Sequence, residues 1–215
     1  MTLLRHHPHG ETLISHAAGA LDPAFSAVLS CHFQFCDACR RRMRTMNDLG
    51  GVLLENLAAQ EDEAFFVRTM DRYAREIAQN ASISSDILAP DPGNEVIMPA
   101  PLARATGLRR ETIPWEEMPH GAKKFDLPKF PGSSASARVI HIEPGAILHS
   151  EKHGGQLVLV LWGAYDFDGA HYARGDLHDM SASGFKTFKS ASPEGVTFFT
   201  AISPIPQFDI IRTAH

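Results

Sequence analysis

Cysteine is scarce in this 215-residue chain, which holds three, all within the stretch CHFQFCDAC from Cys31 to Cys39. Long apolar runs are also missing, since none approaches the roughly 18 residues of a membrane span. The N-terminal MTLLRHHPHGE lacks the apolar core of a signal peptide. We therefore expect a cytoplasmic protein. Because disulfides are rare in that compartment, the clustered cysteines favour a metal or redox site over a disulfide.

Positive charge is limited as well. The chain has 20 Lys and Arg against 25 Asp and Glu, a net charge of −5. This balance argues against a broad surface for nucleic acid or anionic membranes. We expect neither direct DNA binding nor membrane association. A hydrophobic fraction of 44% is ordinary for a globular protein with a buried core.

The first 80 or so residues predict helices. Asp22 and Pro23 have the pattern of an N-cap followed by a first-turn proline. A later helix is expected through RRRMRTMNDLGGVLLENL, and another through DEAFFVRTMDRYAREIAQ. The apolar residues expected to face inward on the first of these two are Met43, Met46, Leu53, Leu54 and Leu57.

The second half of the chain predicts strands. A proline-rich stretch without periodicity separates it from the helices. Beyond that stretch, segments such as QLVLVLWGAYDF and VTFFTAIS are rich in β-branched and aromatic residues, and Asp168-Gly169 is a hairpin-turn signal. The predicted fold class is α+β, a small helical bundle followed by an all-β barrel. The predicted boundaries are a helical domain over 1–79, a linker over 80–101 and a barrel domain over 102–215.

The cysteine stretch has the spacing of a metal site. His32, Cys36 and Cys39 lie at offsets of 0, 4 and 7, which places them on one face of a helix and its end. Zinc prefers thiolate and imidazole ligands in a tetrahedron, and a closed structural site needs a fourth. Cys31 points about 100° away from His32 on the same helix. We expect it to be a small core residue.

The fourth ligand is expected from the N-terminus, where the sequence offers His6, His7 and His9. A redox site and a DNA-binding finger fit the cysteines less well. A thioredoxin-like redox site requires a βαβ context, which the pattern does not predict. A DNA-binding finger requires a basic surface, but residues 1–80 hold 8 Lys and Arg against 10 Asp and Glu.

At these residues a resemblance emerges. The segments RHH and ISHAAGAL, followed by H-x3-C-x2-C, resemble the zinc-binding anti-sigma family. The chain is most similar to the ChrR type, which joins that helical module to a C-terminal cupin barrel, and the similarity extends through VLVLWGAYDFD and YARGD. The resemblance implies one zinc ion per chain, held by His7, His32, Cys36 and Cys39. It implies a zinc-stapled bundle followed by a cupin-like barrel.

The resemblance also implies a function. Members of this family bind and inhibit an extracytoplasmic-function sigma factor, so the expected protein is a negative regulator of transcription in a stress response. RNA polymerase would be affected only indirectly, and the cupin-like domain would be sensory or modulatory, with a possible small-molecule ligand in the barrel. We expect no enzyme activity.

The barrel departs from the metal-binding cupin pattern. Aligned on GGQLVLVLWG, the four positions of the family's barrel ligands carry Ser150, Lys152, Gln156 and Lys186. A protonated lysine does not bind metal. We therefore expect no metal in that site.

One alternative remains open for the barrel. His149, Glu151 and His153 alternate along a strand one register away from the expected ligands. A slip or bulge of one residue would turn this set inward and create a two-histidine, one-carboxylate site. In that case the chain would be a metal-dependent cupin enzyme, similar to a dioxygenase, with a helical extension.

Overall fold

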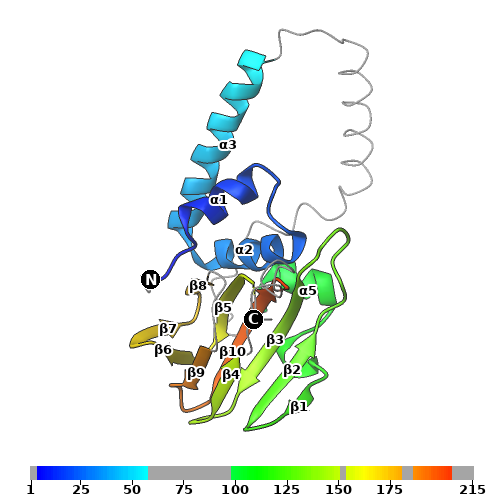
Figure 1. Ribbon diagram of the computed structural model, residues 1–215, viewed down its shortest axis with the longest axis vertical. Coiled ribbons are helices and arrows are strands. Elements are labelled where there is room, and N and C mark those ends of the chain that lie inside the picture. The colour runs from blue at the N-terminus through cyan, green and yellow to red at the C-terminus, as the bar shows by residue number, and fades with distance from the viewer. Residues whose placement is uncertain (1–3, 58–97, 151–153, 181–185, 205–215) are drawn as a thin grey trace, which may run out of the picture.

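The structure, a computed structural model, describes residues 4–57, 98–150, 154–180 and 186–204 (Figure 1). Three of the described helices occupy the N-terminal part, and two short ones precede the strands of the rest. The helical elements are α1 (Gly10–Ala17), α2 (Pro23–Phe35), α3 (Asp37–Leu57), α5 (Ala100–Thr106) and the short 3₁₀ helix η2 (Arg110–Thr112). None of the described helices is long and apolar enough to cross a membrane.

Ten described strands form two antiparallel sheets. The six-stranded sheet has the order β1-β2-β3-β10-β5-β8, and the four-stranded sheet has the order β4-β9-β6-β7. The strands are β1 (Glu116–Met118), β2 (Ala122–Asp126), β3 (Ser136–Ile142), β4 (Ile147–Ser150), β5 (Gln156–Trp162), β6 (Ala164–Phe167), β7 (Ala170–Ala173), β8 (Leu177–Met180), β9 (Lys186–Ser190) and β10 (Val196–Ile202). Asp168 and Gly169 connect β6 to β7 with φ values of 49° and 78°, so the predicted hairpin is confirmed.

The start of α2 follows the predicted capping pattern and is also anchored to the sheet. The Asp22 carboxylate accepts a hydrogen bond from the backbone N–H of Ala24 at 2.9 Å, and Pro23 occupies the first turn. The same carboxylate accepts the Ser133 hydroxyl at 2.6 Å and the Ser134 N–H at 2.9 Å, both from the loop before β3. One side chain thus fixes the helix to the barrel.

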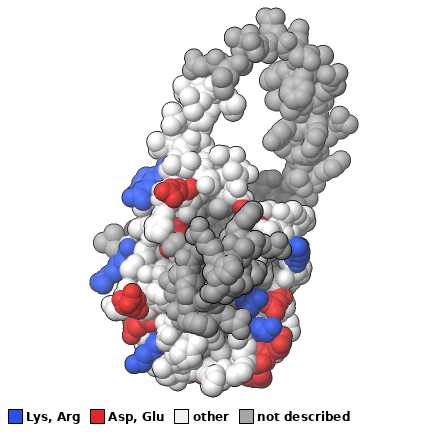
Figure 2. All heavy atoms as spheres, viewed as in Figure 1, with Lys and Arg blue, Asp and Glu red and all other residues white. Residues whose placement is uncertain are grey.

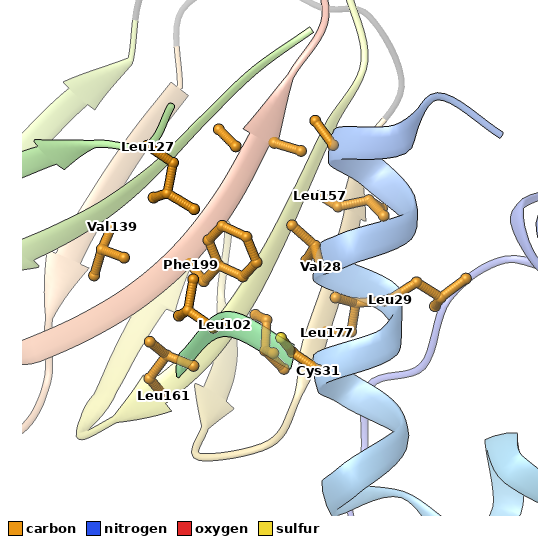
Figure 3. Close-up of a cluster of buried hydrophobic side chains, with 14 of the residues drawn as sticks. Val28, Leu29, Cys31, Leu102, Leu127, Val139, Leu157, Leu161, Leu177 and Phe199 are labelled. Carbon is orange, nitrogen blue, oxygen red and sulfur yellow. The ribbon is translucent and has the colours of Figure 1, made fainter. Parts of the chain in front are cut away.

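Helix α2 packs directly on the six-stranded sheet (Figure 3). Val28, Leu29 and Cys31 on the helix are fully buried in one apolar cluster with side chains from the sheet and from α5. The labelled partners are Leu102 on α5 and Leu157, Leu161, Leu177 and Phe199 on the strands. The helices and the barrel therefore share a hydrophobic core.

A second apolar cluster fills the space between the two sheets. Its largest members are Tyr165, Phe188 and Phe198, each at most 1% exposed. The Tyr165 ring lies 5.3 Å from that of Phe188 and 6.0 Å from that of Phe198, measured between centroids. In the described part of the chain, aromatic side chains thus occupy the barrel interior.

The α+β class, with helices before a cupin-like barrel, is confirmed. One prediction about α3 is wrong: Leu53 and Leu54 are 57% and 69% exposed, because the helix extends away from the barrel beyond its first turns (Figure 1). Helix α5 begins at Ala100, inside the segment predicted as linker. The helix expected near residues 62–79 and the rest of that linker, up to residue 97, lie outside the described residues.

Candidate metal centre

The predicted metal ligands meet at the junction of α2 and α3. His32 lies in the last turn of α2, Cys36 caps that helix in an extended conformation, and Cys39 lies in the first turn of α3. The motif thus spans a break between two helices instead of one continuous helix. His7 comes from the extended segment before α1.

The four side chains are close enough to share one ion. One ligand atom from each of His7, His32, Cys36 and Cys39 lies within 4.8 Å of the others. The Cys36 and Cys39 sulfurs are each 3.4 Å from Nδ1 of His7. Tetrahedral zinc bonds of about 2.3 Å to sulfur and about 2.0 Å to nitrogen place such atoms about 3.5 Å apart. Among the described residues, this is the one cluster of three or more potential ligands.

The His32 ring is oriented for a metal. Its Nδ1 lies 2.9 Å from the carbonyl oxygen of Gly175 and donates a hydrogen bond to it, because a carbonyl can only accept. The other ring nitrogen, Nε2, is buried and has no hydrogen-bond partner in the described structure. Burial lowers the pKa of His32 to about 4, which favours the neutral, metal-binding imidazole. An unpartnered buried nitrogen facing two thiols fits a zinc ligand.

The cysteines divide into two roles. Burial, together with the neighbouring Cys36, raises the pKa of Cys39 to about 12. Two buried thiols this close favour the thiolate form only when a cation lies among them. Cys31, by contrast, is fully buried in the core between α2 and the sheet. This confirms its prediction as a core residue.

The barrel holds the segment that carries His7. The Asp176 carboxylate, in the turn between β7 and β8, accepts the backbone N–H groups of Arg5 at 2.9 Å and His6 at 3.1 Å. The N–H of Leu177 donates to the His6 carbonyl at 3.1 Å. Together with the hydrogen bond that His32 donates to the Gly175 carbonyl, these contacts make one turn of the barrel the support of two of the four candidate ligands.

A second carboxylate of the barrel, Asp179 on β8, accepts the His9 N–H at 2.9 Å and the Thr12 hydroxyl at 2.6 Å. The other two candidate histidines lie away from the cluster. The His6 ring stacks on Tyr172 at 4.1 Å between centroids, and His9 pairs with Asp179. Of the three N-terminal histidines, only His7 belongs to the four-residue cluster. Sequence patterns did not reveal the supporting carboxylates, because their contacts join residues about 170 positions apart.

Replacing Asp176 by alanine is expected to weaken metal binding by about 10- to 100-fold, the usual effect of losing an outer support. The buried carboxylate is 3% exposed, and its loss frees the segment that positions His7. Asp176→Asn keeps one acceptor oxygen and should recover part of the affinity. Competition with a chromogenic chelator measures both variants. Asp166→Ala, at an exposed position of β6, is the matched control, and an equal loss there would contradict the prediction.

The predicted cupin ligand positions are only partly described. Gln156 is 2% exposed, and its Nε2 donates to the Thr200 hydroxyl at 2.9 Å. Ser150 and Lys186 are backbone partners across β4 and β9. Lys152 lies outside the described residues. At the position where the sequence comparison with metal-binding cupins predicts a carboxylate ligand, the chain has the Gln156 amide, which bonds to the Thr200 hydroxyl.

The alternative set starts at His149 on β4. This side chain is exposed, and its Nδ1 lies 3.3 Å from the Thr187 hydroxyl on the paired strand β9. Glu151 and His153, the other two members, lie outside the described residues. The described part of this set therefore points to a surface histidine.

The fold and the cluster together define a class: a two-part protein whose N-terminal helices carry a His and Cys cluster that could hold a metal ion and pack on a cupin-like barrel. The chain is 32% identical over 176 residues to the anti-sigma-E factor ChrR of Cereibacter sphaeroides, covering 81% of this chain and 78% of the relative. No protein-family model matches the chain. On this identity and coverage, the chain belongs to the ChrR family of anti-sigma factors.

One solved structure agrees with this assignment. The crystal structure of Rhodobacter sphaeroides SigE in complex with the anti-sigma ChrR matches with a TM-score of 0.72 and 28% identity, covering 94% of this chain and 100% of that chain. The cupin domain of an XRE family transcriptional regulator from Enterobacter cloacae matches with a TM-score of 0.36 and 17% identity, covering 40% of this chain and 99% of that one.

Proposed function

We propose that this anti-sigma factor binds and inhibits an extracytoplasmic-function sigma factor through apolar surfaces of its N-terminal helices. Membership of the ChrR family and the complex of ChrR with SigE support this function. One zinc ion, held by His7, His32, Cys36 and Cys39, would fix the base of α3 against α2. Because sigma factors act with RNA polymerase, we place the protein in the cytoplasm.

The observation that carries the proposal is an apolar surface on the outer half of α3, here called the α3 face. Its members are large hydrophobic side chains that are 53–69% exposed: Leu49, Val52, Leu53 and Leu54. The outer part of this helix is largely free of charged atoms on the side seen in Figure 2. Exposed apolar patches of this kind mark interaction sites, because large hydrophobic side chains without a binding partner are usually buried.

The proposed function assigns a separate role to each of three segments of the chain. Residues 1–79 would provide the sigma-binding part, 80–101 the connection and 102–215 a modulatory barrel. Helix α2 shares a core with the sheet, and one turn of the barrel bonds to His32 and to the segment that carries His7. These direct contacts favour a barrel that influences the helices.

We propose no catalytic role for the barrel. Its described interior is packed with aromatic side chains, and the Nε2 of the buried Gln156 donates a hydrogen bond to the Thr200 hydroxyl. The metal-dependent cupin enzyme, the alternative from the sequence, depends on Glu151 and His153, which lie outside the described residues.

Purified protein is expected to hold about one zinc ion per chain, as one His and Cys cluster implies. His149→Ala should retain that ion, because its exposed ring contacts a hydroxyl on the neighbouring strand. Elemental analysis of the wild type and this variant measures the content. A second equivalent of metal that disappears in His149→Ala would support the barrel metal site instead.

Coexpression with candidate extracytoplasmic-function sigma factors from the same genome tests the function. We expect one of them to copurify in a one-to-one complex, and the purified chain to repress transcription that depends on that sigma factor. If none of the candidate sigma factors copurifies with the chain, and the chain does not reduce transcription that depends on them, the proposal is wrong.

A further inference from the structure

A polar cleft of about 230 Å³ opens on the outer face of the six-stranded sheet, away from the metal centre. Helix α2 covers one end of this face, where it meets Leu157 and Phe199. The cleft lies at the other end, beside η2 and the ends of β3 and β5. The residues that line it include Arg110, Trp115, Lys123, His141, Trp162 and Thr197.

Trp162, at the end of β5, forms part of the lining of the cleft. Trp162 is 8% exposed, and its indole Nε1 is buried without a hydrogen-bond partner among the described residues. An indole N–H can only donate, so only an acceptor can satisfy it. The Arg110 guanidinium lies over the same ring, 5.1 Å from its centroid. The indole nitrogen is buried beneath the surface, so the group that an anion can meet in this part of the lining is the Arg110 guanidinium.

A second cation lies on the facing wall. The Lys123 ammonium is 3.4 Å from Glu117 and 3.6 Å from Glu143, longer than the 2.7–2.9 Å of a tight charge-assisted hydrogen bond. At these distances the Lys123 ammonium still has N–H groups that can donate to an anion. Glu194 contributes one exposed carboxylate to the lining.

The remaining wall is aromatic and rigid. His141 Nδ1 lies 2.9 Å from the Thr197 hydroxyl, and the His141 ring is 6.0 Å from that of Trp115. Burial lowers the pKa of His141, and the nearby charge of Lys123 lowers it further, although Glu143 opposes this effect. A neutral, fixed imidazole beside an indole provides a surface for a planar ring.

We propose that this cleft binds a small aromatic monocarboxylate. The carboxylate would accept hydrogen bonds from Arg110 and Lys123, and the ring would lie against Trp115 and His141. The volume is below the 300–1,000 Å³ of pockets for drug-sized ligands, which favours a single-ring acid. Binding in this cleft does not require a bound sigma factor. The cleft lies on the outer face of the sheet, apart from the aromatic side chains that pack in the barrel interior.

Intrinsic fluorescence tests this site, because the chain has two tryptophans and both line the cleft. Titration of the full chain with benzoate should change the emission with a saturable curve. Benzamide lacks the charge and acetate lacks the ring, and each should bind at least about tenfold more weakly, the value of one lost charge-assisted hydrogen bond or ring contact.

Variants assign the contacts. Arg110→Ala and Lys123→Ala should each weaken benzoate binding by about tenfold, measured by the fluorescence of the two tryptophans. Lys129→Ala, which removes the same charge at an exposed site outside this cleft, should have no effect. An unsaturable response to benzoate, equal binding of benzamide, or an equal loss in Lys129→Ala would each overturn the proposal.

Discussion

Replacing Cys36 or Cys39 by serine is expected to abolish zinc binding, to release α3 from α2 and to eliminate sigma binding. Each thiol is at most 3% exposed and lies 3.4 Å from His7, so a serine leaves an incomplete set of ligands with two histidine nitrogens and one sulfur. Structural zinc supplies an apparent folding free energy of about 10–16 kcal/mol in finger peptides. Elemental analysis, circular dichroism and copurification with the sigma factor measure the three losses.

The barrel should remain folded in these variants, because its interior cluster between the two sheets does not include the cysteines of the metal centre. Cys31→Ser is the matched control, with the same change of sulfur to oxygen. Its hydroxyl can bond back to a carbonyl of the preceding helical turn, so the variant should keep its zinc and its sigma binding. Retention of zinc and helicity in Cys36→Ser would show that the metal is held elsewhere.

The sequence predicted those parts of the fold that depend on local patterns. The N-cap at Asp22, the hairpin at Asp168-Gly169 and the order of helices before strands follow from residues close together in the chain. The packing of α2 on the sheet was not predictable in this way. Helical periodicity identifies an apolar face of a helix, but it does not distinguish another helix from a sheet as the partner of that face.

The same limit applies to the metal centre. Spacing selected His32, Cys36 and Cys39, and the resemblance selected His7, and the structure brings these four side chains together. The supporting Asp176 could not be predicted because its contacts with Arg5 and His6 are hydrogen bonds to the backbone across most of the chain, which leave no local pattern. For Leu53 and Leu54, periodicity alone does not tell a buried apolar face from one kept for a partner.

Changing both Leu53 and Leu54 to glutamate is expected to weaken sigma binding by at least about 100-fold. A large side chain that is buried at the centre of an interface contributes about 2 kcal/mol or more to the free energy of binding. Burying a carboxylate in its place adds a desolvation penalty. Glutamate has nearly the helix propensity of leucine, so α3 should persist. Because both side chains are more than half exposed, the free energy of unfolding should change by less than about 1 kcal/mol. Titration against the sigma factor measures the affinity, and thermal unfolding measures the stability.

Ile147→Glu is the matched control for this double variant. Ile147 is also a large exposed hydrophobic side chain, at 40%, but it lies on β4 at the barrel. If the α3 face is the docking surface, Ile147→Glu binds the sigma factor with wild-type affinity. The reverse result, with normal binding by the α3 variant and a loss in Ile147→Glu, would place the inhibitory surface on the barrel. The two outcomes separate the contributions of helices and barrel without cutting the chain, which matters because α2 and the sheet share one core.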